Sequence, residues 1–142
     1  MQKITDHNTM PPAAVLAWLS LAASVLLPLG NSAIAGTPIS SARVWPAAEY
    51  TRLTLESASP IQYSLSTVKN PDRVVVDLER VALTTELEKL PAEIDAADPY
   101  IHTMRIGRYK PGVVRLVLDL KTAVMPQAFV LKPVGDYGHR LV

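Results

Sequence analysis

The sequence predicts an all-β protein, a sandwich of two similar small sheets with one short helix between the two halves of the chain. From Gly36 onward, short runs of alternating apolar and polar residues are separated by proline, glycine and asparagine, a pattern typical of sandwiches and barrels. Residues 73–78 (RVVVDL) and 113–120 (VVRLVLDL) show the alternation best. Each contains an Arg and an Asp four positions apart, which places both charges on one face of a strand and apolar side chains on the other.

The Arg and Asp of one such strand do not form an ion pair with each other. A strand rises about 3.3 Å per residue, so residues four apart are separated by about 13 Å. Arg73, Asp77, Arg115 and Asp119 therefore each need a partner on a neighbouring strand, in solvent or in a ligand.

Composition limits the classes of function. A chain of 142 residues is long enough for one core, and its 14 Lys and Arg against 13 Asp and Glu create no positive field that would favour nucleic acid. Cysteine is absent, which excludes disulfides, thiolate metal sites and Cys nucleophiles from this sequence.

Residues 1–35 predict an export signal. An apolar run over residues 13–29 is followed by Ala33-Ile34-Ala35, which fits a cleavage site between Ala35 and Gly36. No Arg-Arg pair precedes the run, so the general secretion route is favoured, and contact with the membrane is expected only through this segment during export. Because the run is longer than most signal cores, a retained membrane anchor is the alternative.

Strands and turns alternate through the rest of the chain. We expect strands over residues 41–46, 50–56, 62–66, 73–78, 101–109, 113–120, 128–132 and 140–142. Between the halves, Leu83, Leu87 and Leu90 recur at helical spacing. Thr85 and Glu88 fit a capping box at the start of this helix, and Pro91 predicts its end.

The order of the arginines indicates an internal duplication. Arg43, Arg52 and Arg73 mark strands of the first half as Arg105, Arg115 and Arg140 mark strands of the second. This predicts two sheets related by a pseudo-two-fold axis, with Arg73/Asp77 and Arg115/Asp119 at equivalent outer positions on the two sheets. If residues 140–142 repeat residues 73–75, the matching Asp falls beyond Val142, so we expect the last strand and the protein to continue.

Charged residues on strand faces are the candidate binding residues, namely Arg52, Glu56, Arg73, Asp77, Arg115 and Asp119. They predict either a ladder of cross-strand ion pairs or a flat polar surface in which Arg binds carboxylates and the acids accept hydrogen bonds. Aromatic residues form a second candidate surface, on which rings could bind sugars. Packing or loop closure is the alternative role of these residues, which are Trp45, Tyr50, Tyr63, Tyr100, Tyr109 and Tyr137.

No catalytic or metal site is predicted. After Gly36 the histidines are His102 and His139, and neither lies in a metal-binding or nucleophile motif. Asp95 and Asp98 precede Pro99, which predicts a turn rather than acid–base chemistry.

Several segments together resemble the AMIN domain, namely residues 43–46 (RVWP), 50–57 (YTRLTLES), 70–78 (NPDRVVVDL), 98–101 (DPYI) and 114–120 (VRLVLDL). They are most similar to the version at the front of periplasmic N-acetylmuramoyl-L-alanine amidases of the AmiC/AmiB type in Gram-negative bacteria. The resemblance covers residues 36–142 almost entirely.

The resemblance implies a sandwich of two symmetrical sheets that binds peptidoglycan at the division septum, with divisome proteins as further candidate partners. The paired sheet motifs of the family correspond to Arg73, Val75 and Asp77 and to Arg115, Val117 and Asp119. A zinc-dependent amidase domain is expected downstream, cleaving the bond between N-acetylmuramic acid and L-alanine. Its zinc ligands and catalytic glutamate are not in this sequence, so neither a cofactor nor a catalytic residue is assigned here. The alternative function is a protein-interaction module of an outer-membrane secretin-type protein.

Overall fold

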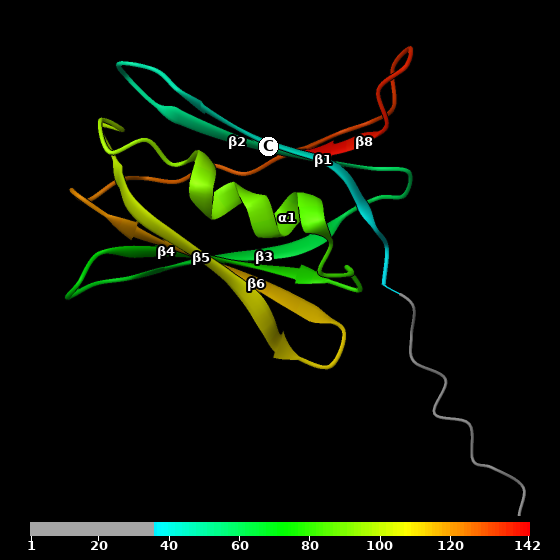
Figure 1. Cartoon of the computed structure of the whole chain (residues 1–142), viewed down its shortest axis with the longest axis horizontal. Helices are drawn as coiled ribbons and strands as arrows, with labels where there is room; N and C mark the ends of the chain where they lie inside the picture. Colours follow the sequence, from blue (N-terminus) through cyan, green and yellow to red (C-terminus); the bar gives the residue numbers. More distant parts are fainter. Residues whose placement is uncertain (1–35) are drawn as a thin grey trace, which may run out of the picture. The chain divides into compact units, whose positions relative to one another are not determined.

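The computed structural model describes residues 36–142, which form two four-stranded antiparallel sheets around one core (Figure 1). The order in sheet I is β1-β2-β8-β7, and the order in sheet II is β3-β4-β6-β5. Sheet I consists of β1 (Ile39–Pro46), β2 (Thr51–Ser57), β7 (Val130–Leu131) and β8 (His139–Leu141). Sheet II consists of β3 (Gln62–Val68), β4 (Arg73–Glu79), β5 (Ile101–Lys110) and β6 (Val113–Leu120). The predicted all-β fold with two sheets is confirmed.

The predicted export signal, residues 1–35, and its cleavage bond lie outside the described residues. Gly36 packs against the backbone at Val81 and Ala82, where an added Cβ would lie 2.5 Å from the Ala82 nitrogen. The next residue, Thr37, donates its N–H to the Arg80 carbonyl at 2.6 Å. Over residues 36–142, the structure contains no helix with the length and apolar character needed to cross a membrane.

The strand order agrees with the predicted repeat. If β1 and β2 correspond to β5 and β6, and β7 and β8 to β3 and β4, sheet I has the order of sheet II read in reverse. Each sheet therefore contains one hairpin from each half of the chain. The central pairs of the two sheets, β2/β8 and β4/β6, are equivalent under this repeat.

The core lies between the sheets, where alternate strand residues meet. In sheet II, Val74, Val76 and Leu78 on β4 and Leu116 and Leu118 on β6 are buried, while the residues between them are only partly buried. This is the period of two expected for strands with one face in the core. Sheet I contributes Ile39, Ala42, Leu55 and Leu141 to the same core.

One helical segment packs between the sheets (Figure 1). It comprises α1 (Thr85–Lys89) and the 3₁₀ turn η1 (Leu90–Glu93), with Leu87 and Leu90 fully buried. The predicted capping box is wrong, because the residue at the N-cap is Thr84, whose hydroxyl donates to the Ile39 carbonyl and accepts no N–H from the helix. Pro91 does not end the segment either. It lies in the first turn of η1, where the backbone N–H has no partner within the helix, so proline loses no hydrogen bond there.

Candidate functional site

A ladder of ion pairs runs along the outer face of sheet II, on its central strands β4 and β6. Their register places Arg73 opposite Asp119 and Asp77 opposite Arg115. Arg73 Nε donates to Asp119 Oδ1 at 2.6 Å, and Arg115 donates through Nε and Nη2 to both oxygens of Asp77 at 2.7 and 2.8 Å. The predicted cross-strand ladder is confirmed for these residues. The prediction that the two motifs lie on different sheets is wrong, because β4 and β6 are neighbours in one sheet.

Arg105 on β5 brings a second cation to Asp119. Its Nη2 lies 3.3 Å from Asp119 Oδ1, and the Thr103 hydroxyl donates to Oδ2 at 3.1 Å. Asp119 thus lies between the guanidinium groups of Arg73 and Arg105, and these three side chains carry one excess positive charge. The Arg105 side chain is 60% exposed, so it is available to a ligand in solvent.

Sequence reasoning did not select Arg105 as a binding residue. The partner of Arg105 is set by the register between β5 and β6, in which Thr103 lies opposite Asp119. Spacing along one strand does not contain this information. The position of Arg105 in the arginine repeat was the available signal, because it marked the strand as equivalent to others that carry charge.

Tyr109 covers the ion pair between Arg115 and Asp77. The Arg115 guanidinium carbon lies 3.3 Å from the centroid of the Tyr109 ring, a cation–π contact that holds both groups in place. Gly107 lies directly opposite Arg115 on β5, and no atom lies within 4 Å of the position that a Cβ would take there. The Arg115 side chain therefore has open space on one side and an exposed aromatic ring on its face.

The guanidinium groups lower the pKa of both carboxyls from the ordinary value of 3.8. For Asp77 the main cause is the hydrogen bond from Arg115, and for Asp119 it is the hydrogen bond from Arg73. The same bond to Asp77 raises the pKa of Arg115. Both carboxylates therefore stay ionised at lower pH than in the unfolded chain. Their contribution to stability is complete above the unfolded pKa and is lost as the pH falls through the folded pKa.

Acid is therefore expected to destabilise the chain through these pairs. We expect the unfolding temperature to fall as the pH is lowered from about 5 to about 2, and to fall less in the Asp77→Asn/Asp119→Asn variant. Circular dichroism at each pH measures this. Asp136→Asn, which removes an exposed carboxylate, is the control and should leave the slope unchanged. Equal slopes for the wild type and the double variant would contradict the assignment.

The other two candidate residues lie on a different sheet. Arg52 and Glu56 are on β2 of sheet I, so the six candidates do not form one surface. The Arg52 guanidinium lies 5.3 Å from the centroid of the Tyr50 ring, and Glu56 Oε1 accepts the Gly138 N–H at 2.7 Å. Among residues 36–142, no carboxylate lies within ion-pair distance of Arg52.

The aromatic candidates divide into structural and exposed groups. The hydroxyls of Tyr63 and Tyr100 donate to the carbonyls of Ala128 and Ala48, which ties loops to the strands. Trp45 is 68% exposed at the end of β1, so the alternative role of packing in the core or its rim is wrong for this residue. Tyr50, Tyr109 and Tyr137 are about half exposed.

Asp98 has a structural role. It is 2% exposed and accepts hydrogen bonds from the backbone N–H groups of Tyr100 and Ile101 and from the Thr51 hydroxyl. Burial by itself would raise the pKa of Asp98, but these hydrogen bonds outweigh it and lower the pKa. The predicted turn is confirmed, and Asp98 also joins β5 in sheet II to β2 in sheet I. Over residues 36–142, no three His, Asp or Glu side chains gather in a way that would hold a metal ion.

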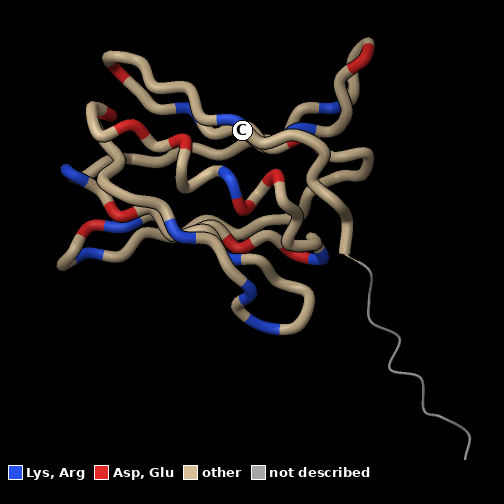
Figure 2. Tube along the Cα trace, in the orientation of Figure 1, with Lys and Arg blue, Asp and Glu red and all other residues tan. Residues whose placement is uncertain are grey.

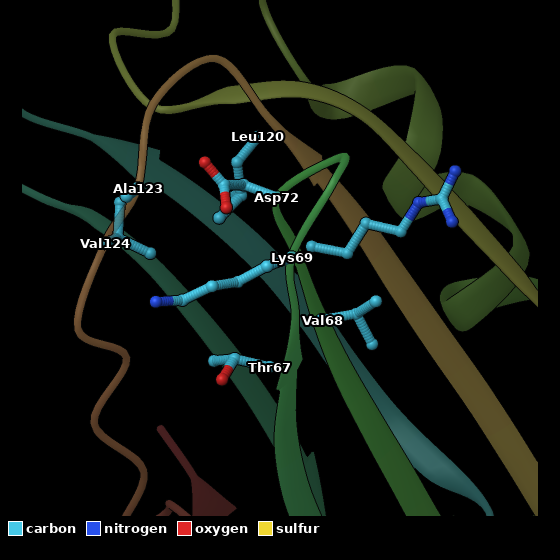
Figure 3. A pocket seen from close by; sticks show the side chains of 8 residues that line it. Thr67, Val68, Lys69, Asp72, Leu120, Ala123 and Val124 are labelled. Carbon is cyan, nitrogen blue, oxygen red and sulfur yellow. The ribbon is translucent and has the colours of Figure 1, made fainter.

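Charges of both signs are interspersed over both sheets (Figure 2). A hollow of about 50 Å³ lies beside Arg73, between the β3–β4 turn and residues 123–124. Figure 3 shows Lys69 and Asp72 on the turn side of this hollow, with Ala123 and Val124 across from them. The hollow is too small for a sugar ring.

Comparison with known protein families identifies the family of this chain. The family model of the AMIN domain matches residues 41–142, which is most of the described structure. The chain belongs to the AMIN domain family. Its motifs at residues 70–78 and 114–120 are the central strands β4 and β6 of this AMIN domain.

Curated relatives of this AMIN domain are amidases of the AmiC type. The chain is 44% identical over 111 residues to N-acetylmuramoyl-L-alanine amidase AmiC of Escherichia coli O6:H1, covering 78% of this chain and 27% of the relative. It is 45% identical over 102 residues to N-acetylmuramoyl-L-alanine amidase AmiC of Neisseria meningitidis serogroup B, covering 72% of this chain and 24% of the relative. The chain spans about a quarter of the length of the curated relatives it matches.

Proposed function

We propose that this AMIN domain binds peptidoglycan and thereby attaches an N-acetylmuramoyl-L-alanine amidase to the cell wall. The observation that carries the proposal is the group formed by Arg73, Asp119 and Arg105 on the exposed face of sheet II. Both relatives are named N-acetylmuramoyl-L-alanine amidase, which supports the amidase assignment. The bond between N-acetylmuramic acid and L-alanine occurs in peptidoglycan.

The chemistry of this face suits a peptidoglycan stem. Stem peptides carry carboxylates and an amine on an uncharged glycan. The excess positive charge of the Arg73, Asp119 and Arg105 group favours a carboxylate, and Asp119 keeps both guanidinium groups in place before the ligand arrives. Tyr109, held on Arg115, offers an exposed ring for the apolar face of a sugar.

Weak individual contacts are sufficient for binding when the ligand is a polymer. Each contact of an exposed Arg with a carboxylate contributes little, but a cell wall presents many identical stems, so one domain that contacts two stems at once binds more tightly than through either contact alone. The near-neutral charge of the chain avoids strong attraction to other polyanions.

We further propose where the parent protein acts. The parent protein lies in the periplasm of a Gram-negative bacterium, is concentrated at the division septum, and acts there in cell-wall cleavage and daughter-cell separation. Divisome proteins are proposed as further partners. The hydrolysis is assigned to a zinc-dependent amidase domain beyond this chain, and the AMIN domain performs none of it.

Sedimentation with purified sacculi tests the proposal. We expect the chain to pellet with sacculi at low and moderate salt, and the Arg73→Ala/Arg105→Ala variant to bind about tenfold or more weakly, because the variant loses both guanidinium groups of the site and two small losses of free energy multiply in the binding constant. Arg43→Ala/Arg108→Ala is the matched control, since it removes the same charge from exposed positions outside the group. A chain that stays wholly in the supernatant would disprove peptidoglycan binding, and equal losses in both variants would show that the contact is not specific to this group.

A further inference from the structure

The two ends of the ion-pair ladder on sheet II differ in chemistry. At one end, Arg73, Asp119 and Arg105 form the group with one excess positive charge. At the other end, the ring of Tyr109 lies on the guanidinium of Arg115. Arg115 and Asp119 are four positions apart on β6, so the two ends are about 13 Å apart on the same face of the sheet.

The Tyr109 end suits a ring that carries no charge. Arg115 donates to both carboxylate oxygens of Asp77, at 2.7 and 2.8 Å, so its charge is already paired and it serves to hold the Tyr109 ring. Open space beside Gly107, directly opposite Arg115, lets a bulky group approach the half-exposed ring. Lys110 Nζ lies 6.0 Å from the ring centroid, where it can donate to a hydroxyl or carbonyl of such a group.

The Arg105 end suits a carboxylate. Asp119 is the one acceptor for the Arg105 side chain within the described residues, and the contact uses Nη2. The Nε and Nη1 groups of Arg105 are therefore free to donate to a carboxylate of a ligand. Because Asp119 balances the charge of only one of its two guanidinium partners, a second carboxylate is favoured here and not at the paired Arg115.

The surface between the two ends is flat and uncharged. Val75 and Val117 lie opposite each other on β4 and β6, and both are partly buried on the outer face. Ser66 on β3 lies beside Val75 and adds an exposed hydroxyl. An extended peptide rises about 3.3 Å per residue, so about four residues of peptide span this surface from one end to the other.

We propose that the outer face of sheet II binds one intact muramoyl peptide, with its sugar ring on Tyr109 and a carboxylate of its attached peptide at Arg73 and Arg105. This rests on the proposed function and adds that the sugar and the peptide must belong to one molecule. Each contact is weak by itself, but binding at one end holds the other end of a joined ligand at a high local concentration.

The ligand is therefore the substrate of an N-acetylmuramoyl-L-alanine amidase and not its products. Hydrolysis adds water across the amide and breaks its C–N bond, which leaves a carboxylate on the sugar part and a free amine on the peptide. The new carboxylate lies beside the sugar ring, whereas the site places ring and carboxylate about 13 Å apart. Material that has been cleaved at this bond is expected to leave the site.

A titration with soluble fragments tests whether sugar and peptide must be joined. The ligand is the disaccharide of N-acetylglucosamine and N-acetylmuramic acid with a four-residue stem, and the controls are the free disaccharide and the free tetrapeptide. Following the NMR signals of the chain, we expect the joined fragment to bind about tenfold or more tightly than either part. Equal affinities of the joined fragment and the tetrapeptide, or no response to any fragment, would overturn the joint site. Sedimentation with sacculi tests peptidoglycan binding separately, so a chain that pellets without this preference rejects the joint site alone.

Substitution of Tyr109 tests the place of the sugar. Tyr109→Ala should lower the affinity for the joined fragment about tenfold and leave that for the free tetrapeptide unchanged, and Tyr109→Phe, which keeps the ring, should bind like the wild type. Tyr137→Ala is the matched control, because Tyr137 is also about half exposed and its ring centroid lies 4.9 Å from the Arg140 guanidinium on sheet I. Equal losses in the two alanine variants, or an equal loss for the free tetrapeptide in Tyr109→Ala, would overturn the assignment.

Discussion

Replacing Leu116 by Ala is expected to lower the free energy of unfolding by about 3 to 4 kcal/mol. Leu116 lies in the middle of β6, is 0% exposed, and pairs across the sheet with Val76 on β4 and Ile106 on β5. Its loss leaves a cavity between the sheets that neighbours on paired strands cannot close by moving. Urea unfolding followed by circular dichroism measures the change.

Two further variants serve as controls for Leu116→Ala. Val117→Ala, at the next position on the half-buried outer face, should cost much less because it opens no enclosed cavity. Leu141→Ala should also cost less than Leu116→Ala, although the two leucines occupy the same position in the sequence Arg-Leu-Val, because Leu141 lines a cleft of about 640 Å³ between β2 and residues 123–129. A loss at Leu141 as large as that at Leu116 would contradict this description of the cleft.

Replacing Asp98 by Ala is expected to lower the free energy of unfolding by about 3 kcal/mol. The change leaves the N–H groups of Tyr100 and Ile101 and the Thr51 hydroxyl without their acceptor, and it removes the side-chain bond from β2 to the start of β5. Because the variant removes a carboxyl whose pKa is lowered in the fold, it should also lose less stability than the wild type in acid.

Asp95→Ala is the matched control for Asp98→Ala. Asp95 lies in the same turn but is exposed, and its side chain accepts one N–H, from Ala97, at 2.8 Å. The control should cost less than about 1 kcal/mol. Equal losses at the two positions would show that the turn, and not the bond between the sheets, is the source of stability.

Local patterns predicted most of the strands of the fold. The alternation in residues 73–78 and 113–120 identified β4 and β6, and proline and glycine marked the turns around them. The error at the helix has a local cause, since Thr84 and Thr85 are both plausible caps and the contact of Thr84 with Ile39 decides where the helix begins. Pro91 was ambiguous because the same residue ends an α-helix or starts a 3₁₀ turn.

The candidate site was predicted only in part. Spacing alone showed that Arg73, Asp77, Arg115 and Asp119 need partners outside their own strands, and the structure supplies those partners. Spacing did not show that β4 and β6 are neighbours, nor that Arg105 reaches Asp119, because both depend on which strands pair.

Local sequence was enough to predict the strand character of residues 36–142, the face of β4 and β6 that carries charge, and the repeat that relates the two halves. These properties depend on residues close together in the chain, where a period of two decides which side chains share a face. The order β3-β4-β6-β5 could be known only from the folded chain. Strand neighbours are chosen by contacts between distant segments, which makes Arg73, Asp119 and Arg105 one charged group and places Arg52 on the other sheet.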